Sequence, residues 1–217
     1  MAKDDVIANI RRSLNRKGPL ATGVAPALER RFGTAPEQIQ PSYDEPLVER
    51  FKRKALAVAS TMADVDSSNA IPTAVNDYLE QHKLPPEIVI AEDEALVNAS
   101  WSNSITVKRG RPADEDRVSV TLAFAGIAES GTVVMLSSKA SPTTLNFMPV
   151  HHIVVLRASD IVAYSEDVWA KLRNELGSMP RTVNFITGPS RTGDVEQMLQ
   201  LGAHGPRCLH VLLIEDR

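Results

Sequence analysis

The sequence is poor in cysteine and in aromatic residues. Its single cysteine, Cys208, excludes a disulfide framework and any iron–sulfur cluster or zinc site built from several thiolates of this chain. Aromatic residues make up 5% of the 217 residues, which is too few for the stacking surfaces that bind single-stranded nucleic acids. The net charge of −3 supplies no overall positive field. We therefore expect no nucleic-acid partner and no cofactor in this chain.

Long apolar runs are also missing. None approaches the roughly 20 residues that span a bilayer, and the opening Met-Ala-Lys-Asp-Asp lacks the apolar core of a secretion signal. We expect a cytoplasmic protein without a membrane span. Cys208 lies in an apolar run typical of a buried strand, so we predict an unreactive thiol in the core rather than a nucleophile.

The chain is predicted to form one domain preceded by an arm. Apolar residues at helical spacing predict a helix over 4–17, and five of the 14 prolines lie within 18–46. A short helix is expected to begin at Pro26 and to run through Phe32. We assign residues 1–45 to an N-terminal helix with a proline-rich arm, and 46–217 to the domain. The arm either wraps on the protein's own surface or binds a partner or a second copy.

Strands and helices alternate along the domain. Such alternation predicts an α/β protein with a mostly parallel sheet, in which ligands bind beyond the carboxyl ends of the strands. Apolar, β-branched runs predict strands at 87–91, 105–107, 118–122, 132–136, 153–156, 183–187 and 209–214. Helical spacing predicts helices at 46–63, 72–82, 165–176 and 191–200.

Residues 187–194, Thr-Gly-Pro-Ser-Arg-Thr-Gly-Asp, are the first candidate binding segment. Gly188 permits a close turn, and Ser190 or Thr192 can cap the predicted helix that follows. Free backbone N–H groups there, with Arg191 beside them, would form an anion site. The segment is neither a P-loop nor a dinucleotide fingerprint. A well-capped helix that binds nothing is the alternative.

Two further segments carry candidate residues. Residues 202–207, Gly-Ala-His-Gly-Pro-Arg, lie between the predicted helix and the last strand, so His204, Gly205 and Arg207 could face the first segment. Arg207 would then help to hold the anion, and His204, like Glu129, is a candidate for moving a proton. An ordinary connection with Arg207 on the surface is the alternative. Glu129 lies among small residues in a predicted turn, where it is a general base or nucleophile if its pKa allows, and otherwise a solvated side chain.

The adjacent pair His151 and His152 suggests a metal site, but neighbouring residues on a strand point to opposite faces of the sheet. No His-x-x-x-His or His-Glu-x-x-His motif is present in the sequence. We therefore expect no metal site, and we expect His152 to be a hydrogen-bonded histidine at the edge of the sheet.

Four stretches together resemble the LutC/YkgG family of lactate-utilisation proteins, which carry a LUD domain. The stretches are Gly-Ile-Ala-Glu-Ser-Gly-Thr (126–132), Pro-Val-His-His-Ile-Val-Val (149–155), Ile-Thr-Gly-Pro-Ser-Arg-Thr-Gly-Asp-Val-Glu (186–196) and Leu-Gly-Ala-His-Gly-Pro-Arg-Cys-Leu-His-Val (201–211). The resemblance covers about residues 45–217. Small departures stand at Ser130, Gly193 and Ala203, where the family often has threonine, alanine and valine.

This resemblance implies a three-layer α/β/α sandwich similar to the NagB/RpiA/CoA-transferase-like fold. It also implies action with two partners, LutA and LutB, whose iron–sulfur clusters serve in the oxidation of L-lactate to pyruvate. The first hypothesis is thus a non-redox subunit of such a system, binding a small carboxylate or phosphate anion. The second is a free-standing isomerase or acyl/CoA transferase acting on a phosphorylated or CoA-linked substrate, and the third is an assembly module. A homodimer is expected only because closed dimers are the commonest oligomers.

Overall fold

The computed structural model describes residues 3–16, 24, 26–27, 40–192, 200–202 and 204–215. The chain divides into two units, Met1–Tyr43 and Asp44–Arg217. In the first unit, α1 spans Lys3–Ser13, with Asp4 and Asp5 in its first turn, where negative charge suits the helix dipole. Most of the short helix expected from Pro26 lies outside the described residues.

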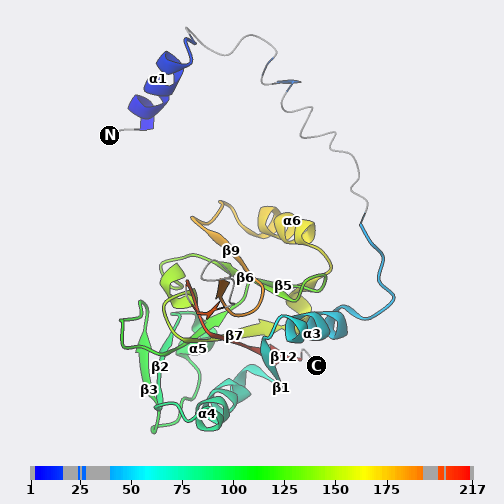
Figure 1. The fold of residues 1–217 in the computed structure, drawn as a ribbon, viewed down its shortest axis with the longest axis vertical. Coiled ribbons are helices and arrows are strands. Elements are labelled where there is room, and N and C mark those ends of the chain that lie inside the picture. The colour runs from blue at the N-terminus through cyan, green and yellow to red at the C-terminus, as the bar shows by residue number, and fades with distance from the viewer. Residues whose placement is uncertain are drawn as a thin grey trace. The chain divides into compact units, whose positions relative to one another are not determined.

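The centre of the second unit is a six-stranded sheet in the order β1-β12-β7-β4-β2-β3 (Figure 1). Every neighbouring pair of these strands is parallel. The α/β class with a mostly parallel sheet is therefore confirmed. The strands are β1 Thr61–Val65, β2 Glu87–Ile90, β3 Thr106–Arg109, β4 Val118–Leu122, β7 His151–Arg157 and β12 Cys208–Ile214.

One face of this sheet is covered by α4 (Ile71–Gln81) and α5 (Glu94–Val97). Pro72 lies in the first turn of α4, where its missing N–H costs no hydrogen bond. Val75 and Leu79 of α4 belong to the same buried cluster as Ile153 of β7. Because both faces are covered at the centre of the sheet, β7 and β12 are buried along nearly their whole length, whereas the edge strands β1 and β3 are mostly exposed or half-buried.

The other face packs against α3 (Leu47–Ala57) and a second, four-stranded sheet. Phe51 of α3 is 0% exposed and shares a cluster with Val154 of β7 and Met135 of β6. The small sheet has the order β8-β5-β6-β9. Its strands are β5 Ala125–Ile127, β6 Thr132–Leu136, β8 Ile161–Val162 and β9 Val183–Ile186. Helix α6 (Ser165–Glu175) packs on this sheet through Val168 and Leu172.

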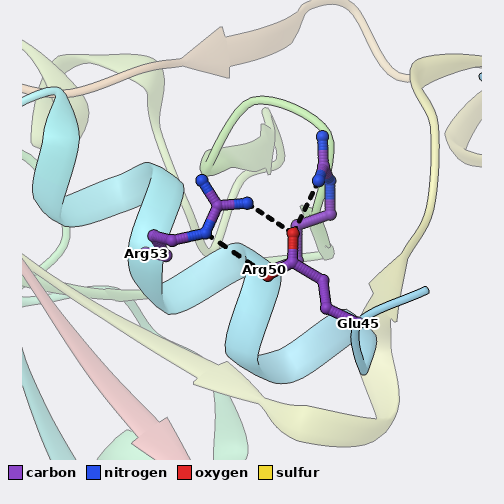
Figure 2. A network of polar contacts seen from close by, with 3 residues as sticks. All are labelled: Glu45, Arg50 and Arg53. Atoms are coloured by element: carbon purple, nitrogen blue, oxygen red, sulfur yellow. Dashed lines mark hydrogen bonds and ion pairs between the residues drawn. The ribbon is translucent and has the colours of Figure 1, made fainter. Parts of the chain in front are cut away.

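A network of three charged residues fixes the start of α3 (Figure 2). The carboxylate of Glu45 accepts hydrogen bonds from Arg50 Nη1, at 2.6 Å, and from Arg53. The hydrogen bond from Arg53 is the main cause that lowers the pKa of Glu45. Because the Arg50 side chain is only 11% exposed, this carboxylate supplies a partner to a charge that burial would otherwise penalise.

Two predicted helices differ in the structure. The helix expected over 46–63 ends at Ala57, because Ala59 adopts a φ of 66° and the chain then enters β1 at Thr61. The helix expected over 191–200 does not start at Arg191. Residues Arg191–Thr192 instead form β10, which pairs antiparallel with β11, Gln200–Leu201, and residues 193–199 lie outside the described part of the chain.

Three short 3₁₀ turns complete the described elements: η1 Ser68–Ala70, η2 Thr143–Asn146 and η3 Ala158–Asp160. Among the residues described, the helices are all too short or too polar to cross a bilayer.

Candidate functional site

A cavity of about 280 Å³ lies between the two segments that the sequence singled out, and we call it the Ser190 cavity. One wall is the backbone from Thr187 to Arg191, which leaves β9. The opposite wall is His204, Gly205 and Pro206, which lead into β12. Phe147, Phe185, Ile186 and Leu209 supply its apolar surface. A small concave space that combines apolar walls with a few polar groups is typical of ligand sites.

Ser190 holds the two walls together. Its backbone N–H donates to the carbonyl oxygen of Pro206 at 2.8 Å, and its own carbonyl accepts from the N–H of Gly202 at 2.9 Å. Its hydroxyl oxygen lies 3.4 Å from the backbone nitrogen of His204, from which it accepts a hydrogen bond. Since an accepting hydroxyl still has its own hydrogen to donate, Ser190 can also bind a ligand oxygen.

Two glycines permit this close approach. Gly188 has a φ of +79°, and a Cβ there would lie 2.4 Å from the carbonyl oxygen of Val58 at the end of α3. A Cβ on Gly205 would lie 3.3 Å from the Cβ of Ser190 and 3.6 Å from the Phe147 ring. Gly188 is therefore required by the backbone, and Gly205 keeps the cavity open.

The two candidate arginines lie in different places. Arg191 lines the cavity, and its Nη2 donates to the carbonyl oxygen of Val58 at 3.0 Å. Arg207 is exposed and packs over Gly202, since a Cβ on Gly202 would lie 2.2 Å from the Cγ of Arg207. Arg207 is not among the described residues that line the cavity, and the side chain of Thr192 lies outside the described part of the chain.

The cavity lies at the opposite edge of the parallel sheet from the one we expected. Residues 204–206 come directly before β12, and Phe147 comes before β7, so the cavity borders the amino-terminal ends of these strands. The preceding strand, β9, joins the small four-stranded sheet, where it pairs antiparallel with β6, rather than extending the parallel sheet. Arg191 and Thr192 are in β10, and residues 193–199, where the helix of the expected anion site was predicted, lie outside the described part of the chain.

Glu129 lies in the hairpin between β5 and β6, beside the end of α3. Gly131, with a φ of +70°, packs so closely on α3 that a Cβ there would lie 2.2 Å from the backbone nitrogen of Ala55. Hydroxyl groups run from this hairpin to the cavity: Ser130 to Thr132 and Thr132 to Thr187, both at 2.6 Å. Thr187 lines the cavity and Glu129 does not, so the structure does not bring Glu129 and His204 together there.

His152 is in the middle of the sheet, not at its edge as predicted. It lies on β7, between β12 and β4, and is 0% exposed. Its Nε2 lies 2.7 Å from Thr121 Oγ1, and among the described residues its Nδ1 has no partner. Burial lowers the pKa of His152 to about 3, so the ring is neutral and structural.

A cluster of rings around Tyr78 was not predicted. The Tyr78 hydroxyl lies 2.9 Å from His151 Nδ1, and the His82 and His210 rings lie 4.2 and 4.5 Å from the Tyr78 ring. His210 Nδ1 is 2.8 Å from Thr61 Oγ1. Burial, and to a lesser extent the electrostatic effect of His82, lowers the pKa of His210 to about 4. The described residues contain no group of three or more His, Cys, Asp or Glu placed to hold a metal. The histidines at 82, 151 and 210 share no helical or strand period, so sequence spacing could not group them.

Comparison with known proteins identifies the family. The family model of the LUD domain matches residues 79–214, which include most of the parallel sheet and of the Ser190 cavity. A protein of known structure, described as a DUF162 family protein from Deinococcus radiodurans, has the same fold. It gives a TM-score of 0.57 at 19% identity, over 80% of this chain and 99% of that one.

Three relatives are called "Lactate utilization protein C". That of Halalkalibacterium halodurans is 31% identical over 120 residues, 54% of this chain and 52% of the relative. That of a Geobacillus species is 32% identical over 54% of this chain and 50% of the relative. That of Anoxybacillus flavithermus is 28% identical over 79% of this chain and 81% of the relative. The match thus spans about half the length of the first two. With the family-model match over more than half of its length, the chain belongs to the LUD domain family.

Proposed function

We propose that this chain serves in L-lactate utilisation as a subunit that binds a small carboxylate and acts with iron–sulfur partner proteins similar to LutA and LutB. The observation that carries the proposal is the Ser190 cavity, which unites two of the four segments on which the family resemblance depends. The names of the relatives in Halalkalibacterium and Anoxybacillus support the choice of lactate.

The cysteine content supports a division of labour between subunits. Iron–sulfur clusters are held mainly by several cysteine thiolates, and this chain has one cysteine. Electrons from lactate would therefore pass to clusters in the partners, while this subunit would bind substrate or product, or the partners themselves.

The chemistry of the cavity suits a small carboxylate. Arg191 uses one N–H on Val58 and has further N–H groups, which can pair with a carboxylate in a bidentate manner. On the same wall, the Ser190 hydroxyl can donate to the second oxygen or to the 2-hydroxyl group. His204 is exposed on the opposite wall, where its ring can form a hydrogen bond with the bound acid and serve as the group that moves a proton. The apolar surface of Phe147 and Leu209 would contact the methyl group.

Complex formation tests the partner half of the proposal. The chain, mixed with the two iron–sulfur proteins of a lactate-oxidation system, is expected to co-elute with them in size-exclusion chromatography. The comparison is with a mixture in which an unrelated α/β protein of equal size replaces it. Separate elution of all components at about 10 μM would contradict a subunit role, because stable subunit contacts have dissociation constants well below that concentration.

A further inference from the structure

A second cavity, of about 600 Å³, shares no lining residue with the Ser190 cavity among the residues described. We call it the Arg181 cavity. It is formed by three connections: Arg111 shortly after β3, residues 137–144 after β6, and Arg181 shortly before β9. The backbone N–H of Glu92, just beyond β2, donates to the carbonyl of Ala140 at 2.7 Å. The cavity thus borders the carboxyl ends of β2 and β3, at the sheet edge where α/β proteins bind ligands.

The charged residues that line this cavity are all cations. Arg111, Lys139 and Arg181 face it, and no carboxylate is among the lining residues that the structure describes. Within the described part of the chain, none of the three forms an ion pair or a side-chain hydrogen bond. The carboxylate of Glu92 lies beside Gly110, outside the lining. Three cations that converge on one concave space raise its potential and attract an anion.

The hydroxyl groups in the same lining are arranged as donors. Ser137 Oγ accepts a hydrogen bond from the backbone N–H of Thr182, and Ser138 Oγ accepts one from Ser141, both at 2.8 Å. With an accepting position occupied in this way, each hydroxyl has its own hydrogen to donate. Thr144 Oγ1 is buried and has no partner among the described residues. An unpaired buried hydroxyl costs free energy that a bound oxygen acceptor would recover.

Size and composition narrow the class of ligand. The volume is within the range of pockets for small organic molecules and is larger than a single phosphate ion needs. The described lining has no aromatic ring on which a nucleobase could stack, and it has four Ser or Thr side chains. We propose that the Arg181 cavity binds a phosphorylated, hydroxyl-rich small molecule, with the cations on its phosphate and the hydroxyls on its sugar or polyol part.

Calorimetric titration of the full chain tests this site, with ribose 5-phosphate as the probe and with ribose and inorganic phosphate as comparisons. We expect ribose 5-phosphate to bind more tightly than phosphate, and ribose not to bind. Binding should weaken as salt is raised, because the attraction is electrostatic. No heat with ribose 5-phosphate at about 1 mM would overturn the proposal. Phosphate binding as tightly as the sugar phosphate would overturn its organic part.

Variants locate the binding. Arg181→Ala and Lys139→Ala should each weaken the affinity for ribose 5-phosphate about tenfold, the effect of losing one charged hydrogen bond. Both side chains are exposed, so the melting temperature should not change. Arg173→Ala on α6 removes an equally exposed cation outside the lining and should leave the affinity within about twofold. If all three variants bind ribose 5-phosphate as tightly as the unmodified chain, the assignment to this cavity is overturned. The outcome is independent of any lactate activity, since neither probe nor variants involve the Ser190 cavity.

Discussion

The guanidinium of Arg191 donates from Nη2 to the backbone carbonyl of Val58, 3.0 Å away, and so joins the wall of the Ser190 cavity to the end of α3. The same carbonyl is the atom that a side chain on Gly188 would strike. Helix α3 starts at the Glu45–Arg50–Arg53 network (Figure 2) and packs through Phe51 against the parallel sheet. The cavity is therefore positioned by a helix that is held at its start and along its buried side.

Replacement of Arg191 tests the carboxylate site. Arg191→Ala should weaken the binding of L-lactate and pyruvate about tenfold, because it removes the charged donor from the cavity. The exposed side chain contributes little to folding, so the free energy of unfolding should change by less than about 1 kcal/mol. Calorimetry measures the first quantity and urea denaturation the second, with Arg173→Ala as the charge-matched control. Affinity unchanged in Arg191→Ala would contradict the assignment.

Gly188 is predicted to be essential to the fold of the cavity wall. Gly188→Ala places a methyl group 2.4 Å from the Val58 carbonyl oxygen and forces a non-glycine residue to a φ of +79°. The left-handed conformation alone costs about 1–2 kcal/mol, so we expect a fall in melting temperature of at least about 3 °C. Gly177→Ala is the matched control, because a Cβ there meets nothing within 4 Å. Equal melting temperatures for both variants would contradict the close packing at Gly188.

Buried His152 should make stability fall in acid. Its pKa drops from 6.5 to about 3 on folding, so the unfolded chain binds a proton that the folded one rejects. The contribution of His152 to the free energy of unfolding is fully present above about pH 6.5 and is lost as the pH falls toward 3. The loss between pH 7 and pH 5 should be roughly 2 kcal/mol.

Chemical denaturation at the two pH values measures this loss. His152→Gln should reduce the pH dependence by that amount, whatever its effect on stability at pH 7. An unchanged pH dependence in His152→Gln would show that the ring does not titrate in this way.

The transferase alternative gives Glu129 a chemical role. Glu129 would have to act as nucleophile or base, but it lies in the β5–β6 hairpin and outside the Ser190 cavity. We therefore predict that the chain alone exchanges no acyl group between acetyl-CoA and lactate, as followed by mass spectrometry. Exchange that Glu129→Gln abolishes would favour the transferase over the lactate subunit.

The bounds of a strand are predicted best where the strand is a compact apolar run with turn residues on both sides. The bounds of β4 and β6 match residue for residue, because Val118–Leu122 and Thr132–Leu136 are compact apolar runs between turns. β1 was missed because Thr61–Val65 continues the helical spacing of α3. The break is the φ of 66° at Ala59, a residue type that carries no turn signal.

The candidate site was predictable in part. The Gly-Pro-Ser-Arg and His-Gly-Pro-Arg segments each contain a Gly-Pro turn pair beside a strand, and the structure brings them into one cavity. Their position at the amino-terminal edge was not predictable, because it depends on β9 pairing with β6 in a separate sheet. The Arg181 cavity joins Arg111, Lys139 and Arg181 from three distant connections, and only the tertiary structure brings them together.

The most direct test of the lactate role is the rate of L-lactate-dependent dye reduction by the two iron–sulfur partner proteins, with and without this chain. The account predicts that the rate depends on the chain, that Arg191→Ala lowers it, and that Arg173→Ala does not. Full activity of the partners alone would contradict the account, because the chain would then have no part in the oxidation.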